Sequence, residues 1–73
     1  MKLPRYFIVG ERPVQFVATA DGGMDVQALN WSTGPFVRDM SYLTRCSLGD
    51  AEVNEVDEKT FAEQLALIRE RLR

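Results

Sequence analysis

The chain has 73 residues, of which 45% are hydrophobic and 27% are charged, and its formal net charge is −2. This balance argues against a disordered or fibrous chain, and the length predicts one domain over residues 1–73 with a small core. Because the net charge is negative, the polyanionic backbone of a nucleic acid meets no overall attraction. Nucleic acid is therefore disfavoured as a partner.

The sequence also bears on where the protein works. It contains one cysteine, Cys46, so it builds no internal disulfide framework. No stretch has the charged and then apolar pattern of a secretory leader, and no apolar run approaches the roughly 18 residues that cross a bilayer. From these observations we expect a cytoplasmic protein with no membrane role.

The first part of the chain has the pattern of strands. Residues 5–10, "RYFIVG", form a short apolar run with aromatic and β-branched side chains, typical of a strand buried on both faces. Residues 11–13 should then turn, because Pro13 donates no hydrogen bond and biases its predecessor towards extended or turn geometry. In residues 14–20, apolar and polar side chains alternate, which predicts a second strand.

A hairpin is expected next. Residues 21–23, "DGG", lie between two strand-like runs, and glycine adopts positive φ angles without steric cost. The run at 24–31 would be the third strand. One of its faces is mixed, because Asp25 and Gln27 share it with Leu29, so we expect that face to lie partly in water.

The stretch "NWSTGPFVRDMSYLTR" allows two interpretations. In one, Ser32 or Thr33 caps a helix that begins near Pro35. In the other, residues 30–34 turn a second hairpin and "PFVRDM" returns as an edge strand, where proline is tolerated. We favour the hairpin because the third strand already offers an edge, and we expect residues 41–48 to bend into a short helix or turn.

The end of the chain predicts a helix. Residues 52–56, "EVNEV", allow a short edge strand before it. Asp57 can cap a helix over 58–72, and apolar residues recur there at spacings of four, three and four, at Phe61, Leu65, Ile68 and Leu72. The predicted fold is therefore α+β: a small antiparallel meander of three to four strands with one C-terminal amphipathic helix packed on one face.

The sequence offers no familiar catalytic set. Histidine is absent, which removes the commonest general base and a common neutral metal ligand. Cys46 has no histidine to activate it and is interpreted as a small buried thiol. The carboxylates between residues 50 and 58 lack the spacing of a calcium loop, and "DGG" is too short for a phosphate loop. We expect no catalytic residue, cofactor or metal site, and a protein that is not an enzyme.

Aromatic and arginine residues remain as candidates for an interaction surface. Trp, Tyr and Arg often dominate protein interfaces, and aromatic rings and arginines also bind single-stranded nucleic acids. The candidates are Trp31, Arg38, Tyr42 and Arg45, for which burial in the core is a third interpretation. Leu67 joins them because helical geometry turns it away from the apolar stripe, among polar neighbours.

These observations lead us to expect a protein-interaction or regulatory accessory module that binds a protein partner or a second copy of itself. Three features favour this function: the missing catalytic set, a small core that would gain from association, and aromatic and arginine residues on mixed faces. The alternative is single-stranded nucleic-acid binding through the aromatic and arginine surface, which the net charge disfavours.

Overall fold

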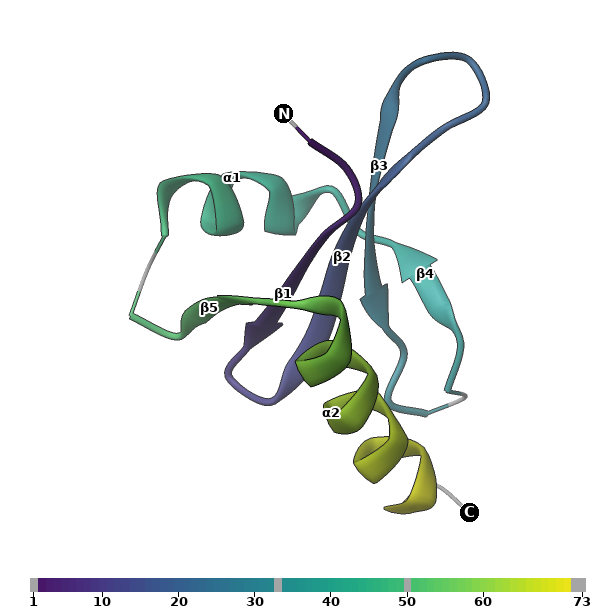
Figure 1. Ribbon diagram of the computed structural model, residues 1–73, viewed down its shortest axis with the longest axis vertical. Coiled ribbons are helices and arrows are strands. Elements are labelled where there is room, and N and C mark those ends of the chain that lie inside the picture. The colour runs from purple at the N-terminus through teal and green to yellow at the C-terminus, as the bar shows by residue number, and fades with distance from the viewer. Residues whose placement is uncertain (1, 33, 50, 72–73) are drawn as a thin grey trace.

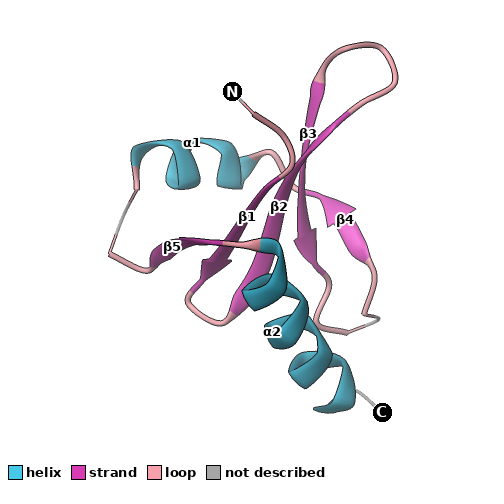
Figure 2. Ribbon diagram, in the orientation of Figure 1, coloured by secondary structure: helices cyan, strands magenta, loops and turns pink. Residues whose placement is uncertain are grey.

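A computed structural model describes residues 2–32, 34–49 and 51–71 of the chain. In these residues the chain forms a five-stranded antiparallel sheet and two helices. Figures 1 and 2 show the twist of the sheet and the helices beside it. The strands lie in the order β4-β3-β2-β1-β5, so the first four form a meander and the chain then crosses through α1 to add β5 beside β1. The elements are β1 (Arg5–Val9), β2 (Arg12–Ala18), β3 (Met24–Leu29), β4 (Phe36–Arg38), α1 (Ser41–Leu48), β5 (Val53–Val56) and α2 (Glu58–Arg71).

The hairpin between β2 and β3 forms at the predicted residues. The Thr19 N–H donates to the Gly23 carbonyl at 3.0 Å, and the Gly22 N–H donates to the Thr19 carbonyl at 3.2 Å. The Asp21 carboxylate accepts hydrogen bonds from the Thr19 hydroxyl and the Gly23 N–H, and the Thr19 bond is the main reason why the pKa of Asp21 is lowered. The Asp21 side chain and the two glycines that follow it together stabilise this turn.

The hairpin interpretation of the next segment is also confirmed, although Thr33 lies outside the described residues. The chain turns between Asn30 and Pro35 and returns as β4. Gly34 has a φ of 89°, a conformation that favours glycine. The Gly34 N–H donates to the Asn30 carbonyl at 2.8 Å. Pro35, which lies opposite Asn30, has no N–H and cannot make this bond. The segment after β4 forms the short helix α1, as expected for residues 41–48.

The expectation of a turn at residues 11–13 is wrong. Arg12 already pairs with Val9 and Pro13 with Ile8, so the turn is formed by Gly10 and Glu11 alone. Gly10 makes this tighter turn accessible with a φ of 63°. In this register the nitrogen of Pro13 points away from β1, so the proline removes no bond between β1 and β2.

The sheet separates two apolar layers. Along β1, neighbouring side chains point to opposite faces. One face carries Phe7 and Phe16, whose ring centroids are 4.8 Å apart, and packs against Cys46 of α1. On the other face, Tyr6 lies against Phe61 of α2 with a centroid separation of 4.7 Å. The two helices thus cover opposite faces of the sheet.

Helix α2 follows the predicted amphipathic pattern. The Thr60 N–H donates to Asp57 Oδ1 at 2.8 Å, and this bond is the main reason why the pKa of Asp57 is lowered. Phe61 and Ile68 are buried, whereas Leu67 is 57% exposed. Leu72, the last residue of the predicted stripe, lies outside the described residues. Neither helix in the described ranges has the length and apolar character to span a bilayer.

The predicted α+β class, with an antiparallel sheet and a packed C-terminal helix, is confirmed. The sheet is larger than the predicted three to four strands because residues 53–56 add to the free side of β1. The second difference is that α1 covers the face opposite α2. The buried thiol of Cys46 belongs to that layer, as the structural interpretation of this residue requires.

The adjacent residues Leu67 and Ile68 test the orientation of α2. Ile68→Ala should lower the free energy of unfolding by about 2–5 kcal/mol because it removes a buried side chain. Leu67→Ala, the matched control on the same helix, should change it by less than about 0.5 kcal/mol. Urea denaturation followed by circular dichroism measures both values. Equal losses from the two variants would contradict this packing.

Candidate functional site

Three exposed apolar side chains lie close together in the sequence, in the turn before β4, in β4 itself and just after it. Within the described ranges, the large hydrophobic side chains that reach solvent are Trp31, Val37, Met40, Leu48 and Leu67. Trp31, Val37 and Met40 come from ten consecutive positions, and they are 42%, 40% and 39% exposed. We call these three residues the hairpin surface. Isolated exposed leucines such as Leu67 are normal, whereas three large exposed apolar side chains within ten positions favour a contact.

The backbone of β4 is part of this surface. The Asn30 N–H donates to the Pro35 carbonyl and the Asp39 N–H to the Val26 carbonyl, both at 2.8 Å. In an antiparallel pair, bonded and non-bonded positions alternate, so the Val37 peptide groups also point towards β3. The N–H and carbonyl groups of Phe36 and Arg38 therefore point away from the sheet. In Figure 1, β4 is the outermost strand on its side of the molecule.

Arg38, a predicted interaction residue, is held by the sheet. Its Nε lies 3.1 Å from Asp25 Oδ1, an oxygen that is buried and has no aligned hydrogen bond. The other oxygen of Asp25 accepts from Gln27 Nε2 at 3.1 Å, and Gln15 Nε2 donates to Gln27 Oε1 at 2.8 Å. This polar row lies on the face that also carries α2. The charge of Arg38 is thus balanced within the hairpin.

Tyr42 and Arg45 lie together on α1 but apart from Trp31 in the chain's fold. Tyr42 is partly buried and packs against the core cluster. The guanidinium carbons of Arg12 and Arg45 lie 5.5 and 5.7 Å from the centre of its ring. Arg45 also forms an ion pair of 3.5 Å with Glu52. These contacts are internal, so Tyr42 mainly fastens α1 to the sheet.

Arg12 is the centre of that attachment. The register of β2 and β3 places Leu29 opposite Pro13, which has no N–H to give. The Leu29 carbonyl instead accepts from Arg12 Nε at 2.8 Å. The same guanidinium donates to the Tyr42 hydroxyl at 3.0 Å. One side chain therefore replaces a missing ladder bond and binds the helix.

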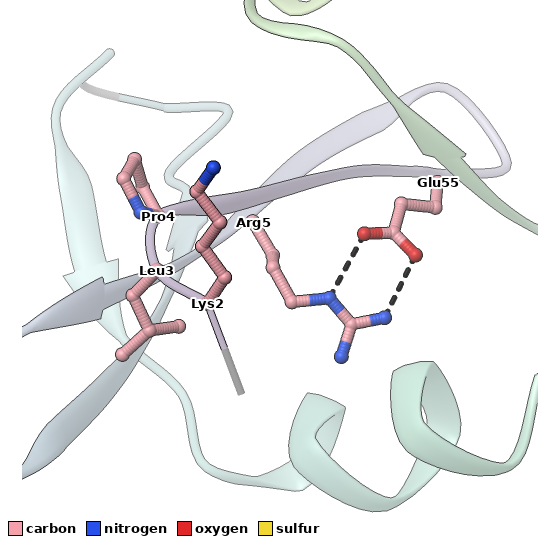
Figure 3. Close-up of a pocket in the computed structure, with 5 residues that line it drawn as sticks. All are labelled: Lys2, Leu3, Pro4, Arg5 and Glu55. Atoms are coloured by element: carbon pink, nitrogen blue, oxygen red, sulfur yellow. Dashed lines mark hydrogen bonds and ion pairs between the residues drawn. The ribbon is translucent and has the colours of Figure 1, made fainter.

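The N-terminal segment borders an open hollow of about 460 Å³, lined by Lys2, Leu3, Pro4, Arg5 and Glu55. Figure 3 shows that the Arg5 and Glu55 side chains point towards one another; their bonds measure 2.8 and 2.7 Å. This pairing raises the pKa of Arg5 and lowers that of Glu55. The charges of Arg5 and Glu55 therefore largely neutralise each other.

The five predicted site residues thus do not form one surface. Trp31 is part of the hairpin surface. Arg38 lies in β4, and Leu67 is exposed on α2. Val37 and Met40 were missed by sequence reasoning. For Val37 the signal was the alternation in "PFVRDM": if Phe36 faces α2, Val37 must face the other side of a narrow edge strand.

Comparison with family models, with characterised proteins and with solved structures finds no match for this chain. Within the part of the chain that the structure describes, no cluster of histidine, cysteine or carboxylate side chains could hold a metal ion. The hairpin surface and its surroundings are therefore the features of the molecule that bear on its function.

The attachment of α1 through Arg12 can be tested by a mutant cycle. Arg12→Ala should lower the free energy of unfolding by about 1.5–3 kcal/mol, because the Leu29 carbonyl loses a charged donor. Tyr42→Phe removes only the hydroxyl acceptor and should cost about 0.5–1.5 kcal/mol. The double variant should lose less than the sum, since both changes remove one shared bond. Strict additivity in urea titrations would show that the two side chains do not interact.

Proposed function

We propose that this protein is a non-enzymatic interaction module, a small accessory or regulatory factor that binds another protein chain through the hairpin surface. The observation that carries the proposal is the exposure of Trp31, Val37 and Met40 on and beside β4, a strand whose outer backbone groups face no other strand in the described part of the chain. Exposed aromatic and methionine side chains are enriched at protein contacts. Open strand edges add main-chain hydrogen bonds to such contacts.

Electrostatics favour a protein partner over a nucleic acid. Arg5, Arg38 and Arg45 each lie against a carboxylate, at 2.7, 3.1 and 3.5 Å. A nucleic-acid surface needs a cluster of positive charges whose counterions are released on binding. The exposed ring of Trp31 is the one feature that suits base stacking, so single-stranded nucleic acid is the second candidate.

The test compares three forms of the protein as baits in a lysate of its own cells. The baits are the wild type, Trp31→Ala and the control Leu67→Ala, which also removes a large exposed apolar side chain. We expect a protein that is retained by the wild type and the control but lost from Trp31→Ala, since truncating a hot-spot residue costs about 2 kcal/mol or more.

Identical recoveries from all three baits would overturn the role of the hairpin surface. A second measurement addresses the other candidate: titration with a single-stranded oligonucleotide at low salt, followed by the fluorescence of Trp31, the only tryptophan. Salt-sensitive quenching in the wild type, together with weaker binding of a labelled oligonucleotide by Trp31→Ala as measured by the anisotropy of the label, would favour the nucleic-acid function.

A further inference from the structure

The open edge of β4 is complementary to itself. Its outward peptide groups belong to Phe36 and Arg38, which lie on either side of Val37. When two copies of the strand run antiparallel about Val37, each Phe36 stands opposite Arg38 of the other copy. This is a bonded position of the ladder, in which the two residues exchange N–H and carbonyl bonds. The twofold symmetry repeats the exchange, so every outward group of the strand finds a partner.

The side chains fit the same register. Val37 would meet Val37 of the other copy at a non-bonded position, where Cα atoms approach to about 4.5 Å and side chains touch. The paired register ends at residues 36–38, because Met40 has helical dihedral angles as the N-cap of α1 and Gly34 lies in the turn with a φ of 89°. The second copy would therefore cover Val37 directly.

The residue at the axis distinguishes this edge from the other one. On β4 the charged side chain is Arg38, and Asp25 balances it within each copy at 3.1 Å. Charge is balanced at the opposite edge as well, because Glu55 of β5 pairs with Arg5 at 2.7 Å and the preceding Glu52 pairs with Arg45 at 3.5 Å. Pairing of two β5 strands would place the polar side chain of Asn54 or Glu55 near the axis, whereas pairing of two β4 strands places Val37 there, an apolar side chain that is 40% exposed.

We propose that the partner of the hairpin surface is a second copy of this chain, joined by antiparallel pairing of the two β4 strands about Val37. The inference rests on the proposed function, because it assigns an occupant to the same surface. It makes the sheet continuous across a twofold axis, with both copies of α2 on one face and both copies of α1 on the other.

Cysteine cross-linking tests the register. In Val37→Cys, the new thiols would face each other across the axis at a separation that a disulfide can bridge. With oxidised glutathione as the oxidant, we expect Val37→Cys to form a disulfide-linked dimer at least about tenfold faster than the control Leu67→Cys does. The wild type, whose Cys46 is buried, should not cross-link. Equal rates for the two variants, or faster linkage of Leu67→Cys, would overturn the proposed register.

Sedimentation equilibrium tests the association itself. The wild type should pass from monomer to dimer as its concentration rises. Val37→Lys should weaken the dimer at least about tenfold, because two ammonium groups would stand directly opposite, whereas Val37→Thr keeps the side chain's shape and should associate normally. Circular dichroism confirms that each variant is folded.

A wild type that stays monomeric throughout, or a mass that grows beyond the dimer, would overturn the inference. The lysate test separates this failure from that of the proposed function. If the chain is monomeric but loses a captured protein on Trp31→Ala, the hairpin surface binds a different chain and only the homodimer is wrong.

Discussion

The fold depends on how Arg12 compensates for a proline. Pro13 lies inside β2, where a strand ordinarily donates an N–H to its neighbour. Arg12 supplies the missing donor to the Leu29 carbonyl at 2.8 Å and also reaches the Tyr42 hydroxyl of α1. Without that side chain, the end of β3 would keep an unpaired buried carbonyl and α1 would lose a fixed point on the sheet. The position of the hairpin surface follows from this contact, since β3 leads directly into it.

A related compensation occurs at the other end of the hairpin. Pro35 cannot bond to the Asn30 carbonyl, and Gly34 does so in its place at 2.8 Å, with a φ that suits glycine. This turn sets the register in which Phe36 faces Phe61 of α2, with ring centroids 5.9 Å apart. Since Phe36 points towards α2, Val37 must point to the opposite face, beyond the reach of that helix. Burial of one side chain therefore leaves its neighbour exposed.

The predictable part of the fold is the part controlled by local pattern. Alternation in residues 14–20, the glycines after Asp21 and the helical spacing of Phe61, Leu65 and Ile68 each act within one element, and the structure has all of them. The end of the first hairpin was misplaced because the missing donor of Pro13 is replaced by a side chain, which no local rule anticipates. Likewise, Tyr42 has the residue type of a contact surface, yet its partners come from β2 and α1. Only the tertiary arrangement decides between those uses.

The two edges of the sheet differ in a way that limits assembly. An open strand edge can add further chains without end unless length or charge prevents it. Here β4 is three residues long, and β5 bears Glu55 beside the exposed Glu52. If two copies pair through β4, both outer edges of the joined sheet are β5. Because the twofold pairing uses the single β4 edge of each copy, and the β5 edges left outside are only four residues long, pairing through β4 would give a closed dimer rather than a filament.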